Sequence, residues 1–299
     1  MKNELVNKIL KREESLTRSE IITVVLGNLC IIFILVGLCG VLKVKHDYLK
    51  TNSSYENVSD SFVKGVAEGM QKGGISESIP TITIPADSVS GDAGNENAEA
   101  ADETVTAIVP EWYDYIEVDF DGLKKENEDI VGWLWFENEE ISYPIMQSDN
   151  NEEYLHKTFT GEEAIAGSIF LDCNNSNDFK DPVSIIYGHN MRNKTMFGKL
   201  KYYMQDGYYE EHQYFQIRTP KAAYRYRIVS YKTVNQKDEI YQGDFDGRNL
   251  STYMNEVVFK DSLMDLGINV ANDDNFVILS TCNGSGSRFT ITAVKVGKW

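Results

Sequence analysis

Hydrophobic and polar positions divide this chain into three zones with different patterns. The first zone holds an unbroken apolar run at 21–42, with 22 residues, no charge and one strongly polar side chain, Asn28. As a helix this run would be about 33 Å long, enough to cross a hydrocarbon core of roughly 30 Å. A buried core helix of that length would normally show a polar stripe, and none is visible. The pattern therefore predicts a transmembrane helix.

A cleaved signal peptide is the alternative interpretation of the apolar run. The run is longer than the usual apolar part of a signal peptide, and no clear small-x-small cleavage site follows it, so we expect an uncleaved anchor. Five Lys and Arg side chains precede the run and three follow it closely, which favours a cytoplasmic segment 1–20 and an extracellular remainder. Cys30 and Cys39 lie inside the run and are interpreted as small apolar side chains facing lipid.

The second zone, 43–110, is predicted to be a flexible acidic extracellular spacer. Residues 51–110 contain no Trp and one Tyr, and their two basic and ten acidic side chains give a net charge of −8. Such a stretch cannot bury enough apolar surface to offset the entropy lost on ordering it. At most, a short helix is expected around Ser59–Met70.

The third zone, 111–299, contains apolar and aromatic runs bounded by turn residues, which is typical of a single folded domain rich in strands. The strand candidates are Ile130–Phe136, Ile141–Gln147, Ser168–Asp172, Val183–His189, Tyr214–Thr219, Tyr224–Val234, Phe276–Cys282 and Phe289–Val296. Tyr224–Val234 alternates clearly and predicts a half-buried antiparallel strand. About eight strands without a regular strand–helix alternation predict a mainly β fold, a closed or nearly closed barrel with inserted helices.

Helix candidates in the third zone are fewer. Tyr113–Glu126 is expected to hold one or two short helices, and Met196–Met204 another. The clearest candidate is Leu250–Leu266, where apolar residues recur at i, i+3, i+4, i+7 and i+8. Gly267 then follows at the position of a C-terminal cap.

Composition narrows the function classes. The 299 residues carry 29 basic and 46 acidic side chains, and the formal net charge of −17 argues against a general nucleic-acid-binding protein. Four Cys do not make a disulfide scaffold. Zinc-type Cys/His spacings and Walker or dinucleotide glycine patterns are missing from the sequence, and the acidic stretch 149–153 lacks EF-hand spacing. We therefore expect no metal site and no cofactor.

Candidate chemistry lies at two strand ends. Cys282 closes the run FVILSTC before the turn NGSGS, and Arg288 follows that turn closely enough to return beside the thiol and favour its thiolate. His189 closes the run VSIIYGH. A Cys and a His ending strands at one sheet edge would fit a nucleophile with its base, although a lone His is more often structural and the sequence leaves their meeting open. Cys173 has no base nearby in sequence and is interpreted as structural.

Several separated motifs together resemble the class B sortases. They are GSIFLD at 167–172, SIIYGHNMRNKTMFGKL at 184–200, LSTC at 279–282 with Arg288, and the closing FTITAVKV, and the segment 127–159 is similar to the start of the same catalytic domain. The resemblance covers essentially all of 111–299, with the motifs in the correct order. It implies an eight-stranded sortase-type β-barrel with N-terminal helices and a helix inserted between strands six and seven, where Leu250–Leu266 lies.

The resemblance also implies roles for individual residues. Cys282 would be the nucleophile, His189 the acid/base partner and Arg288 the cation that stabilises the oxyanion or positions the substrate. Ser280 matches a position lining the substrate groove, and the backbone N–H of Asn283 is a candidate second oxyanion donor. No metal or cofactor takes part in this chemistry.

The implied activity is transpeptidation on the outer face of a Gram-positive membrane. A secreted surface protein would be cleaved at the Thr of an LPXTG- or NPQTN-like sorting signal, and an amine of the peptidoglycan precursor would take its place. A pilus-polymerising sortase that uses a pilin Lys as the acceptor is the first alternative. A papain-type endopeptidase is disfavoured because His189 precedes Cys282 by 93 residues, and a caspase-like enzyme lacks these motif contexts. A binding module with the same fold is disfavoured by its retention of Cys, His and Arg.

Overall fold

The computed structural model describes residues 17–65, 83–84, 105–106, 115–242, 245, 247–282 and 286–299. The chain divides into two compact units, Met1–Lys50 and Thr51–Trp299. Helix α2 (Arg18–Phe62) begins in the first unit and ends in the second. A reciprocal capping box opens the helix, because Thr17 N donates to a Glu20 carboxylate oxygen at 2.8 Å and Glu20 N donates to Thr17 Oγ1 at 3.4 Å.

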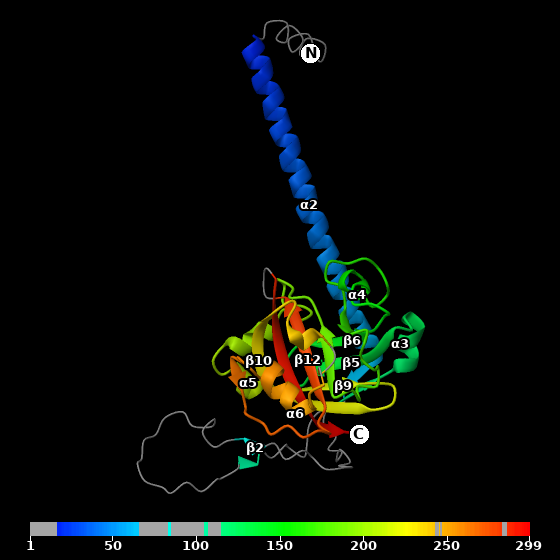
Figure 1. The fold of residues 1–299 in the computed structure, drawn as a ribbon. Helices are drawn as coiled ribbons and strands as arrows, with labels where there is room; N and C mark the ends of the chain where they lie inside the picture. The colour runs from blue at the N-terminus through cyan, green and yellow to red at the C-terminus, as the bar shows by residue number, and fades with distance from the viewer. Residues whose placement is uncertain are drawn as a thin grey trace. The chain divides into compact units, whose positions relative to one another are not determined.

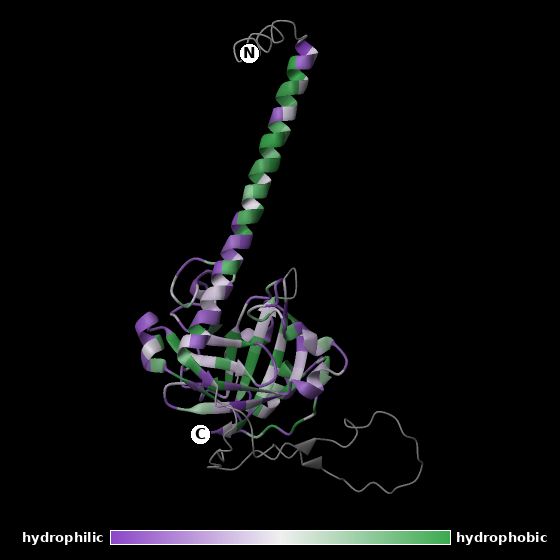
Figure 2. Cartoon of the chain, turned by 180° about the vertical axis from the view of Figure 1, so that it is seen from behind, coloured by the Kyte–Doolittle hydropathy of each residue, from purple (hydrophilic) through white to green (hydrophobic). Residues whose placement is uncertain are grey.

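Helix α2 is apolar on all sides along the predicted span 21–42, as the green band in Figure 2 shows. None of its most apolar 18-residue window is buried, although a soluble core helix would bury most of such a window. By length and composition α2 is able to cross a membrane.

Eight strands of the second unit form a closed barrel. They are β5 (Ile130–Phe136), β6 (Ser142–Met146), β7 (Ile169–Leu171), β8 (Val183–Tyr187), β9 (Tyr214–Arg218), β10 (Ala223–Asn235), β12 (Phe276–Cys282) and β13 (Ser287–Lys298). Their order is β10-β13-β12-β8-β7-β6-β5-β9, and β9 pairs with β10 to close the ring. Figure 1 shows β13, in red, between β10 and β12. The predicted eight-stranded barrel is therefore confirmed.

Two of the strand pairs in this barrel are parallel, β6 with β7 and β8 with β12, and the others are antiparallel. Aromatic side chains fill much of the interior, and Trp133, Phe215 and Tyr226 are completely buried. Burying a side chain of this kind contributes about 1.5–3 kcal/mol, so the aromatic-rich strands account for much of the stability of the barrel.

Strand β10 differs from its predicted half-buried pattern. Its first eight residues are all buried. It pairs with β9, β13 and the short β11 (Met264–Asp265), and two further elements, η2 (Leu200–Met204) and α5 (Tyr208–Glu211), pack over it. Tyr209 of α5, for example, donates to the Ile228 carbonyl at 2.9 Å. The alternating residues of β10 therefore lie on two faces that are both buried. One face carries charged side chains, such as Arg225, which forms a salt bridge with Glu137 at 2.7 Å.

The insertion between β10 and β12, the sixth and seventh barrel strands, is helical but shorter than predicted. It contains η3 (Glu239–Tyr241), α6 (Leu250–Tyr253) and the π-helical turn η4 (Met254–Val258). The helix ends at Val258 rather than Leu266, because Asp261 adopts a left-handed φ of 58° and Met264 then pairs with Tyr231 of β10. Gly267 follows this strand and does not cap a helix. The helix predicted over Met196–Met204 is likewise limited to η2, since Met196 has a φ of 52°.

The N-terminal part of the second unit contains a segment that was expected to be spacer. Residues 51–65 belong to this compact unit, where α2 continues to Phe62 and β1 (Val63–Gly65) follows. Tyr55 and Val58, one helical turn apart, are each only 4% exposed, and this pair of apolar contacts explains why the segment docks. The short helix predicted around Ser59–Met70 is thus the end of α2, with 66–70 outside the described residues.

Two small strand pairings lie before the barrel among the described residues. Strand β1 pairs with β4 (Ile116–Val118), and β2 (Thr83–Ile84) pairs with β3 (Val105–Thr106). Helix α3 (Phe120–Glu126) follows β4, capped by the Asp119 carboxylate that accepts from Gly122 N. Of the predicted helical stretch Tyr113–Glu126, Phe120–Glu126 is helical and Ile116–Val118 is a strand, while 113–114 lie outside the described residues. Most of the predicted spacer lies outside the described residues.

Candidate active site

Three neighbouring strands bring the predicted catalytic residues to one end of the barrel. Strand β8 ends two residues before His189, and β12 ends at Cys282. In the parallel β8–β12 pair Ser280 lies beside Tyr187, so the same register carried two residues further brings His189 to the level of Cys282. In the antiparallel β12–β13 pair the register partner of Cys282 is Arg288. The sequence could not show that these residues meet on neighbouring strands.

Two hydrogen bonds continue this register past the strand ends. Gly188 N donates to the Ser280 carbonyl at 3.1 Å, which prolongs the pairing of β8 and β12. The side-chain amide of Asn190 then donates to the Cys282 carbonyl at 2.8 Å. Asn190 therefore joins the segment after His189 directly to the backbone of the candidate nucleophile. Its position within the YGHN motif was the only sequence signal for it.

His189 is half-buried, and a backbone carbonyl fixes its ring. Nε2 of His189 lies 2.7 Å from the carbonyl oxygen of Leu155, which belongs to helix α4 (Glu153–His156). A carbonyl oxygen can only accept, so Nε2 carries the proton in this bond. The neutral imidazole consequently keeps its lone pair on Nδ1, which is the nitrogen able to take up a proton.

Ser280 is buried, and its hydroxyl is bound to a tyrosine that the sequence did not suggest. The Oη of Tyr241, in η3, lies 2.8 Å from Ser280 Oγ. The Tyr241 ring stacks on Tyr187 at 6.2 Å, and Tyr187 donates to the Asp172 carboxylate at 2.8 Å. Burial is the main cause that raises the pKa of Tyr241 to about 12, so this phenol is a neutral hydrogen-bonding group beside the site. Tyr241 follows the mixed sequence QKDEI, in which no pattern distinguishes it.

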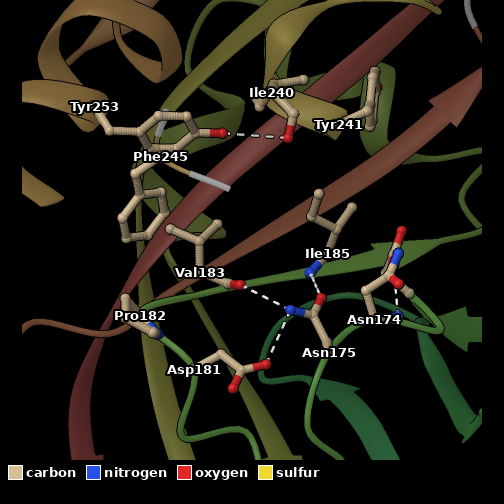
Figure 3. Close-up of a pocket in the computed structure, with 11 residues that line it drawn as sticks. Asn174, Asn175, Asp181, Pro182, Val183, Ile185, Ile240, Tyr241, Phe245 and Tyr253 are labelled. Atoms are coloured by element: carbon tan, nitrogen blue, oxygen red, sulfur yellow. Dashed lines mark hydrogen bonds between the residues drawn. The ribbon is translucent and has the colours of Figure 1, made fainter. Parts of the chain in front are cut away.

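A pocket of about 320 Å³ extends from Tyr241 along β8. Figure 3 shows one wall of Ile240, Phe245 and Tyr253 and another of polar side chains. Asn175 belongs to the polar wall, and its side-chain amide donates to Asp181 and to the Val183 carbonyl at 3.0 Å each. The pocket combines apolar contact surface with fixed polar groups, a composition that suits a peptide segment.

The two remaining candidate residues differ in what the structure describes. Arg288 is half-buried at the start of β13, and its Nη1 lies 3.3 Å from the Ser287 carbonyl. Asn283 lies outside the described residues. Cys282 itself is half-buried, accessible enough to react.

Comparison with known proteins decides the family. The chain matches the sortase domain family over residues 137–296, just over half of its length. The chain belongs to the sortase family. Sortase B of Staphylococcus aureus is 29% identical over 203 residues, covering 68% of this chain and 83% of that protein. Sortase B of Listeria monocytogenes is 36% identical over 162 residues, covering 54% of this chain and 65% of that protein.

A solved structure agrees with these sequence relatives. The Streptococcus pyogenes class B sortase involved in pilus biogenesis superposes with a TM-score of 0.55 at 31% identity, covering 60% of this chain and 98% of that one. The protein is a class B sortase, and its enzyme class is that of the sortase cysteine transpeptidases.

Cys173 of this sortase has a different environment from Cys282. Burial, and then the neighbouring Asp172 carboxylate, raise the pKa of the Cys173 thiol and keep it protonated. Its backbone N–H donates to Asn151 Oδ1 at 2.8 Å, so the segment is held by its main chain. These contacts agree with the structural interpretation of Cys173.

Gly188 provides a test of how tightly this sortase packs behind His189. A Cβ at Gly188 would lie 2.4 Å from Ile169 Cδ1 and 2.7 Å from Phe197 Cδ2. We expect Gly188→Ala to lower the free energy of unfolding by about 1–3 kcal/mol through overpacking, and to lower activity by displacing His189. Thermal unfolding and peptide turnover measure the two effects. Gly161→Ala, at a glycine with open surroundings, should lower stability alone, and unchanged unfolding of Gly188→Ala would contradict the packing.

Proposed function

We propose that this class B sortase cleaves an LPXTG- or NPQTN-like sorting signal at its Thr and joins the Thr carboxyl to an amine of a cell-wall precursor. The observation that carries the proposal is the arrangement of His189, Cys282 and Arg288 at the end of three neighbouring strands of a sortase barrel. A thiol, a base and a fixed cation together meet the requirements of covalent acyl transfer.

The proposed first half-reaction forms a thioester. Nδ1 of neutral His189 first takes the proton of the Cys282 thiol, which gives a thiolate and an imidazolium. The thiolate attacks the carbonyl carbon of the Thr, and the carbonyl π electrons move onto oxygen. Arg288, with the backbone N–H of Asn283, stabilises this oxyanion by donating hydrogen bonds. The oxyanion then re-forms the carbonyl and the C–N bond breaks, while imidazolium His189 gives its Nδ1 proton to the leaving amine. Its Nε2–H donates to the Leu155 carbonyl throughout.

The second half-reaction reverses these roles with a new amine. The acceptor amine attacks the thioester carbonyl, and neutral His189 takes a proton from its nitrogen at Nδ1. Collapse of the tetrahedral intermediate expels the Cys282 thiolate and leaves a new amide. The enzyme returns to its starting state without a cofactor or an oxidant.

Substrate recognition is proposed for the pocket that Tyr241 and β8 line. Tyr241 lines this pocket, and its hydrogen bond of 2.8 Å to Ser280 links the pocket to the strand that ends at Cys282. The residues of the sorting signal that precede Thr would lie along the apolar wall of this pocket, and secreted surface proteins carrying the signal are the proposed partners.

The proposed location is the cell membrane. The apolar part of α2 supports a single-pass anchor, and the excess of basic side chains before 21–42 supports a cytoplasmic N-terminus with an extracellular catalytic unit. The acidic residues of the spacer would be repelled from anionic lipid and keep that segment off the surface.

A pilin Lys is the second candidate acceptor. It is favoured by the similarity to the Streptococcus pyogenes class B sortase involved in pilus biogenesis. Both acceptors present a primary amine, so they share every chemical step above and differ only in the surface that delivers the nucleophile.

The proposal is tested by trapping the acyl-enzyme. The chain is incubated with a library of peptides carrying variants of the two motifs and no amine, and intact mass spectrometry then follows. We expect an adduct on Cys282 that ends at Thr, which reveals the preferred motif. A glycine-based and a lysine-based amine are next added separately, and the faster product identifies the acceptor class. A peptide cleaved without any covalent adduct would contradict the thioester route.

A further inference from the structure

The end of helix α2 contacts the same loop that holds His189. This loop, 152–168, runs from the turn before α4 to the residue before β7 and is called the α4 loop below. Tyr55 enters it from α2 and is 4% exposed. Its ring centroid lies 5.3 Å from that of Phe159 in the α4 loop and 5.4 Å, edge-on, from that of Tyr143 in β6. The side chain is therefore enclosed between the barrel and the loop.

The hydroxyl of Tyr55 binds the last two residues of this loop. It donates to the Gly167 carbonyl at 2.8 Å and lies 3.0 Å from Ser168 Oγ. Ser168 in turn binds the beginning of the loop, with Oγ donating to the Lys157 carbonyl at 2.8 Å and N donating to the Tyr154 carbonyl at 2.9 Å. Burial raises the pKa of Tyr55, so the phenol stays a neutral donor.

Gly167 then passes this constraint to the carbonyl that binds His189. A Cβ at Gly167 would lie 2.5 Å from the Leu155 carbonyl oxygen, and its φ of +54° is a left-handed conformation that favours glycine. The Leu155 carbonyl thus packs directly against the Gly167 backbone. That same oxygen lies 2.7 Å from His189 Nε2. Three contacts in sequence join the Tyr55 hydroxyl to the imidazole.

We propose that Tyr55 is a positioning residue for His189. By fixing Gly167, its hydroxyl holds the Leu155 carbonyl in place, and the carbonyl keeps the neutral imidazole protonated on Nε2 with its lone pair on Nδ1. The inference rests on the proposed acid/base role of His189 and adds that the end of α2 positions the His189 ring. The helix that carries the apolar span thereby ends in a contact that orients the catalytic base.

The tautomer of His189 gives a direct test. The chain has four His residues, so ¹⁵N-histidine labelling of the full chain in detergent micelles gives few imidazole signals, and His189→Gln assigns the relevant one. In the unmodified protein we expect the neutral ring to be protonated on Nε2. In Tyr55→Phe we expect a mixture of tautomers. The kcat for peptide transfer should fall about tenfold and KM should stay unchanged. The loss is smaller than the roughly 10²–10⁴-fold rate contribution of general acid–base catalysis, because His189 is still present.

Tyr209→Phe is the matched control. Like Tyr55→Phe, it removes one hydroxyl that donates to a backbone carbonyl. Tyr209 lies in α5, and its hydroxyl donates to the Ile228 carbonyl at 2.9 Å. It should change neither the tautomer nor kcat. Tyr55→Phe with an unchanged tautomer overturns the proposal, whether or not kcat falls, because the effect would then not pass through the imidazole. Activity retained by Cys282→Ala would instead refute the proposed function, and the imidazole signal needs no turnover to be read.

Discussion

Cys282→Ala is expected to abolish transpeptidation, the largest effect of any single substitution in this chain. In the proposed mechanism the Cys282 thiolate forms the bond that holds the acyl group between the two half-reactions, and neither His189 nor Arg288 can take over that role. The fold should be unaffected, because Cys282 is half-buried at the very end of β12 and the substitution removes a single atom. Mass spectrometry of the ligated product and thermal unfolding measure activity and stability on one sample.

Cys173→Ala is the matched control for this prediction. Cys173 also follows a strand, but its thiol is held protonated by burial and by Asp172. The substitution should therefore leave transfer unchanged. Product formation at a normal rate by Cys282→Ala, or loss of the acyl adduct in Cys173→Ala, would show that Cys282 is not the nucleophile.

His189→Ala is expected to lower kcat by roughly 10²–10⁴, the range typical of a lost general acid and base. In the proposed mechanism two steps depend on it, because the ring protonates the amine that leaves and deprotonates the amine that arrives. Single-turnover measurements should therefore show a slower formation of the acyl-enzyme as well as a slower reaction with the acceptor. Substrate affinity should change little, since the pocket lined by Tyr241 does not include His189.

His156→Ala tests whether the effect is specific. The His156 ring lies 6.4 Å from that of His189, but it is exposed on the α4 loop. It is not required by the proposed mechanism, and we expect near-normal kcat. Equal losses in the two variants would show that the loop as a whole, and not His189 as a proton carrier, limits the rate.

The barrel could be predicted because most of its strands carry their own signal. Phe276–Cys282 and Phe289–Val296 are apolar or alternating runs bounded by turn residues, and the structure has strands at both. The predicted end of the helix at Leu266 was wrong because of a tertiary contact. Residues beyond Val258 keep an apolar pattern that suits a helix. Met264 instead pairs with Tyr231 of β10. A strand partner more than thirty positions away cannot be recognised from the local sequence.

In the candidate site, too, the residues with a local sequence signal could be predicted and the contacts from distant segments could not. Cys282 and His189 could be found because strand ends beside polar turns are visible in sequence, and their motifs resemble a family. The contacts that orient them could not be found, because they use backbone atoms or side chains from distant segments. The Leu155 carbonyl has no sequence signature, and Tyr55 lies in a stretch whose composition suggests a spacer. Two well-placed apolar side chains were enough to dock that stretch.

The parallel pairing of β8 with β12 also has a consequence for the newly made chain. His189 and Cys282 are 93 residues apart, and they become neighbours only when β12 inserts beside β8. Such distant contacts form late, since closing a long loop costs entropy before any contact compensates for it. A partly folded chain therefore carries Cys282 without its proposed base. The thiol acquires this partner only as the barrel closes, so the proposed chemistry depends on completion of the fold.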